Sequence, residues 1–223
     1  MKPTSEFHFV KKYNFDILER SVEDRPDGVP LVTVCNHTSC LDDPCCVGLM
    51  KMRNVLEHTT LGARELLFST PLRSAFFSRA KAIPVVRGDG VYQKGVDVAI
   101  EQLNKGEWIH VFPEGAINVN DTIKRLKWGV GRLIAEAQVT PIVVPFWHEG
   151  MDDVLPNRSP YIPKIMKRVT VLIGEPMEFT ETIEEYRKTK KNAMETRKLI
   201  TDLIQERFKE LKVETQLLHN KWR

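Results

Sequence analysis

The chain has 223 residues, of which 42% are hydrophobic and 28% are charged, and its formal net charge at pH 7 is +3. These proportions are typical of a globular protein and exclude an intrinsically disordered chain. A chain of this length can bury a full hydrophobic core, so we expect a single domain over residues 1–223.

The charge is distributed unevenly along the chain. Residues 51–94 and the tail from Tyr186 are basic, whereas residues 1–50 and 95–185 are net acidic. Basic surface favours an anionic partner such as phosphate groups or an anionic membrane, and ordinary solvated helix faces are the alternative. We expect a membrane surface and no nucleic acid as a partner, and we leave a homo-oligomer open.

The sequence contains no run of roughly 18 apolar residues of the kind that a membrane-spanning helix needs. Residues 1–6 lack both the apolar centre of a signal peptide and the Arg-rich pattern of a transit peptide. We therefore expect a protein that is soluble or lies on a membrane without crossing it.

Short apolar runs alternate with helical patterns along the chain. A polar loop at 22–30 contains Pro26, Gly28 and Pro30. Runs that are apolar throughout are typical of strands buried on both faces, so the alternation predicts an α/β fold with a mixed, mostly parallel central sheet flanked by helices. We predict strands at 7–10, 31–35, 82–86, 108–112, 141–147 and 169–173, and helices at 95–104, 128–137 and 183–223.

Residues 47–80 combine many large apolar side chains with Arg and Lys, and Pro71 interrupts them. This pattern is typical of a helical segment that lies in a membrane interface, with an apolar wedge and a basic rim. Two ordinary amphipathic helices packed on the sheet are the alternative.

A histidine follows the buried run 31–35, and an aspartate follows that histidine after four residues. A neutral His37 can take a proton from a hydroxyl that attacks an acyl carbonyl, and Asp42 can orient the ring and stabilise the imidazolium. A second His-x4-Asp match, His148 and Asp153, follows the strand at 141–147. It comes after bulky Phe146 and Trp147, which favours a packing or substrate-lining role for His148. We therefore predict His37 and Asp42 as the catalytic pair.

Other chemistries have less support in the sequence. There is no Gly-x-Ser-x-Gly elbow and no phosphate-binding Gly-rich loop, so direct attack by an acceptor hydroxyl is favoured over a covalent acyl-enzyme. We expect no metal and no cofactor. The cysteines fit neither a zinc site nor a disulfide scaffold, and we expect free thiols. They are Cys35, Cys40, Cys45 and Cys46.

Four blocks of the sequence resemble the glycerolipid acyltransferase family. The stretch 36–42 is similar to its His-x4-Asp block, and 83–87 to its second block, whose Arg contacts the acceptor phosphate. The stretches 112–115 and 142–145 are similar to the third and fourth blocks, in the same order and spacing. The resemblance implies the glycerolipid acyltransferase fold. The substrate-binding residues that it implies are Asn36, Arg87, Phe112, Pro113, Glu114 and Gly115. For Glu114, binding of glycerol hydroxyls and capping of a helix are both open.

Three longer stretches, 87–95, 127–136 and 147–157, resemble one branch of this family, and the resemblance runs from about Leu31 to His219. It implies a transacylase that moves fatty acyl groups between phospholipids and lysophospholipids without an obligatory acyl-CoA donor. The implied lipids are cardiolipin, monolysocardiolipin and phosphatidylcholine, and the implied location is the mitochondrial outer and inner membranes, facing the intermembrane space. An acyl-CoA-dependent lysophospholipid or glycerol-phosphate acyltransferase is the alternative enzyme. A peripheral lipid-binding or scaffold protein is the non-enzymatic alternative.

The chain departs from the family pattern after its third block. Residues 116–118 are Ala-Ile-Asn, where the family usually has Thr-Arg-Ser. A phosphate contact is lost there, and we expect Lys124, Arg125 or Lys127 to replace it. Members of the branch often begin with a longer apolar segment, which leaves the mode of membrane attachment open.

Overall fold

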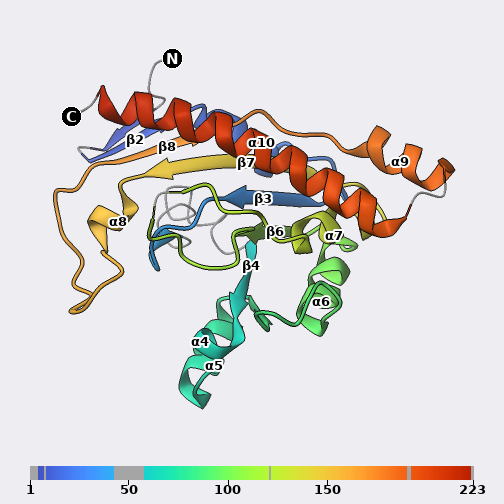
Figure 1. The fold of residues 1–223 in the computed structure, drawn as a ribbon, viewed down its shortest axis with the longest axis horizontal. Coiled ribbons are helices and arrows are strands. Elements are labelled where there is room, and N and C mark those ends of the chain that lie inside the picture. The colour runs from blue at the N-terminus through green and yellow to red at the C-terminus, as the bar shows by residue number, and fades with distance from the viewer. Residues whose placement is uncertain (1–4, 8, 43–57, 121, 190–191, 222–223) are drawn as a thin grey trace.

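The computed structural model describes residues 5–7, 9–42, 58–120, 122–189 and 192–221. Its centre is one eight-stranded sheet with the strand order β1-β2-β8-β7-β3-β6-β4-β5 (Figure 1). The pairs β1–β2 and β7–β8 are antiparallel, and all other neighbours are parallel. The predicted fold class, a mixed and mostly parallel sheet flanked by helices, is confirmed. The strands are β1 (Ser5–Phe7), β2 (Val10–Tyr13), β3 (Leu31–Cys35), β4 (His58–Ala63), β5 (Ala82–Val85), β6 (Trp108–Val111), β7 (Ile142–Glu149) and β8 (Val169–Ile173).

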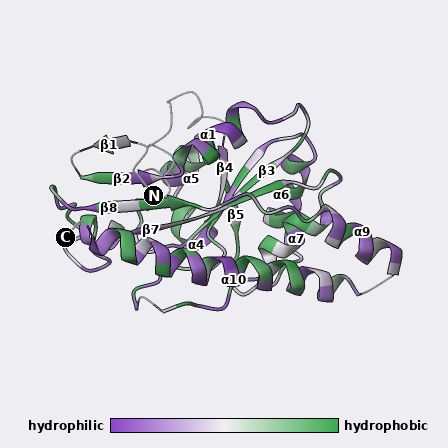
Figure 2. Cartoon of the chain, turned by 90° about the horizontal axis from the view of Figure 1, so that it is seen from above, coloured by the Kyte–Doolittle hydropathy of each residue, from purple (hydrophilic) through white to green (hydrophobic). Residues whose placement is uncertain are grey.

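Helices cover both faces of the sheet. One core cluster joins the central strands to α6, α7 and α10, and a second joins them to α1. In Figure 2 the central strands are mostly hydrophobic, whereas α10 carries both hydrophobic and hydrophilic residues along its length. The helices are α1 (Phe15–Glu23), α4 (Arg64–Leu67), α5 (Pro71–Arg79), α6 (Lys94–Leu103), α7 (Gly129–Glu136), α8 (Met151–Val154), α9 (Thr180–Thr189) and α10 (Ala193–Asn220).

Strand β3 shows why a run that is apolar throughout forms a strand at the centre of the sheet. Val32 and Val34 join the cluster under α10, whereas Leu31 and Cys35 join the cluster under α1. Successive side chains of a strand point to opposite faces, so a strand with helices on both sides buries every residue. All five residues of β3 are buried.

Most predicted elements lie within three residues of the observed ones, and β3 and β8 match their predictions. The edge strand predicted at 7–10 is instead an antiparallel pair, β1 and β2. Helix α1 was not predicted. The helix predicted over 183–223 divides into α9 and α10, and Asn192 caps α10 by accepting a hydrogen bond from the backbone of Met194.

The prediction of a helical segment over 47–80 is wrong for residues 58–63, which form the partly buried strand β4. This strand pairs with β6 on one side and β5 on the other, so its backbone is satisfied within the sheet. Gly62 allows α4 to fold back closely, because a Cβ there would lie 2.2 Å from Leu67 Cδ1. Residues 64–79 are helical, as α4 and α5, and residues 47–57 lie outside the described residues. Within the described residues, no helix is both long and apolar enough to cross a membrane.

Candidate active site

Three parallel neighbours, β7, β3 and β6, end at the same edge of the sheet. The last residues of β7 and the segments that follow the three strands, which cover 148–157, 36–42 and 112–118, are joined there by hydrogen bonds. In open α/β sheets, ligands bind outside the carboxyl ends of the strands. The His-x4-Asp segment and the segment that contains Glu114 therefore belong to one site.

His37 and Asp42 form a hydrogen-bonded pair at the centre of this site. His37 Nδ1 lies 2.8 Å from Asp42 Oδ2, which also accepts the backbone N–H groups of Thr38 at 2.6 Å and Ser39 at 2.8 Å. An ionised carboxylate only accepts hydrogen bonds, so Nδ1 carries the proton and Nε2 is the basic nitrogen. The side chain of His37 is 19% exposed, and its Nε2 forms no hydrogen bond within the described residues. The pair thus has the arrangement of a general base and its orienting carboxylate.

The Asp42 side chain is completely buried, yet its surroundings favour the charged form. Burial alone would raise the pKa of Asp42. Nearby His148 and His37, and hydrogen bonds with their rings, outweigh this effect and hold the pKa of Asp42 well below its usual range. Asp42 is therefore ionised at neutral pH, and its carboxylate lies beside the ring of His37.

Glu114 and Phe112 fix His37 from the neighbouring strand. Glu114 Oε1 accepts the backbone N–H of His37 at 3.0 Å, and the ring of Phe112 stacks on the imidazole with 4.2 Å between centroids. The Glu114 side chain is buried, and its Oε2 has no hydrogen-bond partner within the described residues. Burial raises the pKa of Glu114, against the opposing effect of the His37 N–H. Glu114 thus caps the His37 backbone rather than a helix, and contact of Oε2 with acceptor hydroxyls stays a prediction.

Backbone hydrogen bonds hold the rest of the turn that follows β6, residues 112–118. Pro113 O accepts the backbone N–H of Lys127 at 2.7 Å, and Asn118 donates its backbone N–H to His37 O at 2.6 Å. Gly115 has φ +73, a conformation that other residues rarely adopt. Of the three basic residues expected to replace the lost phosphate contact, Lys124 is the one whose charge acts on Glu114. The turn therefore supports the His37 loop through main-chain geometry.

The side chain of Asn36 forms hydrogen bonds within the protein. Its Oδ1 accepts the backbone N–H of His148 at 2.9 Å, and its Nδ2 donates to His148 O at 3.0 Å. The residue is 1% exposed, so the predicted substrate-binding amide instead joins the ends of β3 and β7. The sequence contains no signal for this pairing, because the two residues are 112 positions apart.

The histidine and the aspartate of the second His-x4-Asp match do not form the pair that their spacing suggests. His148 is fully buried, and its Nε2 lies 3.5 Å from Asp42 Oδ1. Asp153 lies on α8 and is exposed. The histidine of the second match therefore faces the aspartate of the first, a contact that sequence reasoning missed.

Arg87 lies apart from this constellation. It follows β5, which is separated from β3 by β6 and β4, so three inter-strand steps amount to roughly 14 Å. Arg87 Nε lies 3.4 Å from Glu65 Oε1, and both side chains are substantially exposed. The structure thus places Arg87 at the same edge of the sheet as His37 but not beside it.

The described cysteines are free thiols: Cys35 is buried and Cys40 is exposed. Cys45 and Cys46 lie outside the described residues. Among the residues that the structure covers, no cluster of three or more His, Cys, Asp and Glu is arranged to hold a metal ion.

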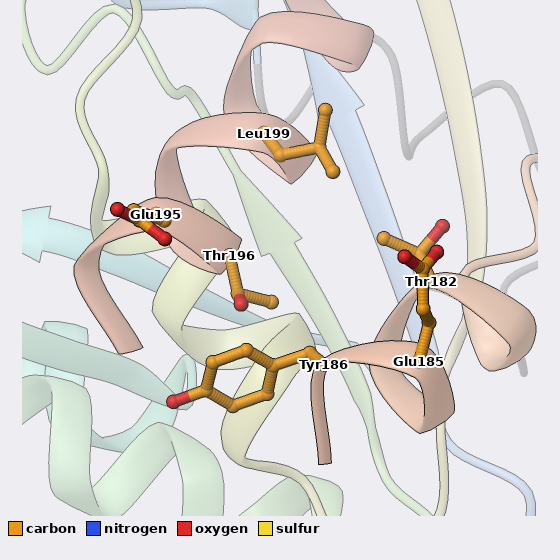
Figure 3. Close-up of a pocket in the computed structure, with 6 residues that line it drawn as sticks. All are labelled: Thr182, Glu185, Tyr186, Glu195, Thr196 and Leu199. Carbon is orange, nitrogen blue, oxygen red and sulfur yellow. The ribbon is translucent and has the colours of Figure 1, made fainter. Parts of the chain in front are cut away.

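A hollow of about 250 Å³ lies between α9 and α10 (Figure 3). In Figure 1, α9 lies at the end of the molecule away from the arrowheads of β3 and β7. This hollow is therefore not part of the site around His37. Its lining residues are Thr182, Glu185, Tyr186, Glu195, Thr196 and Leu199.

Known proteins are similar to this chain in sequence. Tafazzin of Drosophila melanogaster is 46% identical over 93% of this chain and 56% of its own length. The N-acylphosphatidylethanolamine synthase of Arabidopsis thaliana is 42% identical over 75% of this chain and 62% of its own length. The chain thus spans about three fifths of the curated relatives that it matches.

A solved structure shows the same fold at lower identity. The crystal structure of the 1-acyl-sn-glycerophosphate acyltransferase PlsC from Thermotoga maritima aligns with a TM-score of 0.61 and 20% identity. The alignment covers 92% of this chain and 72% of the bacterial one. The family model named Acyltransferase matches residues 16–149, which contain β3, β6, most of the site and the His37–Asp42 pair. This chain belongs to the Acyltransferase family.

Proposed function

We propose that the protein is a phospholipid–lysophospholipid transacylase in which His37 is the general base and Asp42 its partner. The observation that carries the proposal is the 2.8 Å contact between His37 Nδ1 and Asp42 Oδ2, which leaves Nε2 as the basic nitrogen. The identity with the Drosophila and Arabidopsis relatives supports phospholipids as the substrate class.

The site supports a direct transfer. Nε2 of His37 takes the proton of the acceptor hydroxyl while the hydroxyl oxygen attacks the ester carbonyl of a donor phospholipid. The tetrahedral intermediate then breaks its bond to the donor's glycerol oxygen, and that oxygen takes the proton back from Nε2. The products are the acylated acceptor and a lysophospholipid.

Cardiolipin, monolysocardiolipin and phosphatidylcholine are the lipids of this proposal, and mitochondrial membranes facing the intermembrane space are its location. They rest on the resemblance of residues 87–95, 127–136 and 147–157 and on the 46% identity with tafazzin.

A lipid exchange assay tests the activity. The purified chain receives monolysocardiolipin and phosphatidylcholine with a labelled acyl chain, with and without acyl-CoA. We expect label in cardiolipin without acyl-CoA. Transfer only from acyl-CoA would replace the proposal by the acyl-CoA-dependent alternative, and binding without transfer would replace it by a lipid-binding protein. A parallel reaction with phosphatidylethanolamine tests acylation of an amine, the activity that the Arabidopsis relative's name describes.

Arg87 is proposed to bind an acceptor phosphate. A guanidinium binds phosphate through two parallel hydrogen bonds, which an ammonium cannot reproduce. Arg87→Lys should therefore raise the KM for the lysolipid while kcat and the unfolding temperature stay unchanged. Glu65→Gln, which removes the carboxylate beside Arg87, is the control and should not raise this KM. An unchanged KM in Arg87→Lys would exclude the phosphate role.

Two exposed apolar surfaces face away from the core at the edge that contains His37. Both follow carboxyl ends of parallel strands: α4 and α5 come after β4, and the loop 158–167 comes after β7 and α8. In α4 and α5, Leu66, Leu72 and Phe76 are 50%, 81% and 65% exposed. Exposed apolar residues among basic ones are typical of membrane-interface segments. The loop carries four further exposed apolar residues, Tyr161, Ile162, Ile165 and Met166.

Leu72→Asp combined with Phe76→Asp should release the protein from vesicles. Burying each large side chain in lipid contributes about 1.5–3 kcal/mol, so the double variant should bind at least about 100-fold more weakly. Helices α4 and α5 bury no residue, so the fold should persist. The measurement is sedimentation with phosphatidylcholine vesicles that contain cardiolipin.

The matched control for this double variant introduces two aspartates at exposed leucines on another helix. Leu199 and Leu203 of α10 are also exposed, and their replacement by Asp should leave vesicle binding unchanged. High salt should weaken binding of the unmodified protein only in part, since the apolar contribution is not screened. A folded Leu72→Asp, Phe76→Asp protein that still binds would shift attachment to the loop 158–167.

A further inference from the structure

We propose that His148 is a positioning residue that holds the Asp42 carboxylate in place for His37. The inference rests on the acyl transfer proposed above and adds to it a residue from a second strand. It begins from the arrangement of the carboxylate, which lies between two imidazoles and gives one oxygen to each.

The strand register brings the two histidines together. Cys35, the last residue of β3, pairs with Phe146 of β7, so His37 leaves the sheet beside His148, which still belongs to β7 and pairs with Val171 of β8. Asn36 then fixes the backbone of His148 through both atoms of its amide. The ring of His148 is held at the edge of the sheet by its own main chain.

The neighbours of the His148 ring determine which nitrogen carries the proton. Nε2 lies 3.2 Å from Asn36 O and 3.5 Å from Asp42 Oδ1, and both atoms are acceptors. Nε2 must therefore be the protonated nitrogen. Its N–H donates to Asn36 O and also faces Asp42 Oδ1, an oxygen that forms no hydrogen bond within the described residues.

The contact between His148 and Asp42 matters because both side chains are fully buried. The side chains of His148 and Asp42 are both 0% exposed, so water does not solvate the carboxylate. A buried carboxylate needs compensating donors to stay ionised and in one rotamer. Thr38, Ser39 and His37 supply them at Oδ2, and Nε2 of His148 lies 3.5 Å from Oδ1 as the neighbouring polar group on that side. His148 itself is too buried to reach an acceptor hydroxyl.

Two substitutions distinguish the effect of the contact between His148 and Asp42 from the effect of the volume that the His148 ring fills. His148→Leu keeps an apolar side chain of similar reach but has no donor, whereas His148→Gln places an amide N–H close to the position of Nε2. We expect kcat for acyl transfer to fall about 10- to 100-fold in His148→Leu, the range found when a partner that orients a functional histidine is lost. The KM for the lysolipid should stay the same, and His148→Gln should recover at least tenfold over His148→Leu.

A double-mutant cycle with Asp42→Asn tests whether His148 acts through Asp42. If it does, His148→Leu should cost little more once the carboxylate is gone. His219→Leu is the control, because His219 is also buried but its Nδ1 bonds the hydroxyl of Thr170 in β8 at 2.9 Å. It should reduce stability without changing kcat.

The outcomes distinguish this inference from the proposed function. An inactive unmodified protein overturns the transacylase, whereas an active protein with unchanged kcat in His148→Leu overturns the role of His148. Equal losses in His148→Leu and His148→Gln, or additive losses with Asp42→Asn, would also overturn it. If His148→Leu does not unfold cooperatively, His148→Asn replaces it: its shorter amide does not reach Asp42, so its kcat should lie at least tenfold below that of His148→Gln.

Discussion

Replacement of His37 by alanine should reduce acyl transfer to near background. A positioned general base contributes about 100- to 10,000-fold to a rate, and the described site contains no other histidine whose basic nitrogen is both unbonded and partly exposed. The loss should appear in kcat, because the imidazole acts on the reacting hydroxyl rather than on the lipid headgroup. The measurement is the initial rate of label transfer from phosphatidylcholine to monolysocardiolipin at saturating acceptor.

The control for this variant is His58→Ala. His58 begins β4, at the opposite edge of the sheet from His37, and its loss should leave the rate unchanged. Thermal unfolding of both variants excludes a folding defect. An active His37→Ala protein together with an inactive His148→Leu protein would transfer the role of base to His148.

Asp42→Asn should lower kcat by at least about 100-fold. Oδ2 faces N–H groups of His37, Thr38 and Ser39, so the amide oxygen of an asparagine would take its place and the proton would stay on Nδ1 of His37. The variant loses the negative charge that stabilises the imidazolium, and its amide nitrogen faces Nε2 of His148 in place of Oδ1. Asp153→Asn, which changes the exposed aspartate of the second His-x4-Asp match, should leave kcat unchanged. Equal activity of the two variants would remove Asp42 from the mechanism.

The same variant should change how stability depends on pH. The pKa of Asp42 in the folded protein lies below the value of about 3.9 in an unfolded chain, so the group stabilises the fold above that pH. This contribution is lost as the pH falls toward the folded-state pKa. Urea unfolding should therefore show Asp42→Asn to be less stable at pH 7, with a smaller further loss of stability on acidification than the unmodified protein. Parallel stability curves would contradict an ionised Asp42.

The elements that sequence predicted well are those whose pattern is local. The strands at 31–35 and 169–173 are buried runs of β-branched and apolar residues, and burial on both faces produces that pattern wherever they lie in the sheet. The prediction failed at β4, whose Thr59, Thr60 and Gly62 show no strand periodicity. Its pairing with β5 and β6 determines its structure instead.

The candidate site divides in the same way. The sequence by itself determined the α/β class and the His37–Asp42 pair, because a short loop after a buried strand places these two residues close together. Tertiary structure alone decided that His148 faces Asp42, that Asn36 joins two strands, and that Arg87 lies three strands from His37. These contacts depend on strand order and register, which arise from packing between segments far apart in the chain. No residue spacing in the sequence indicates them.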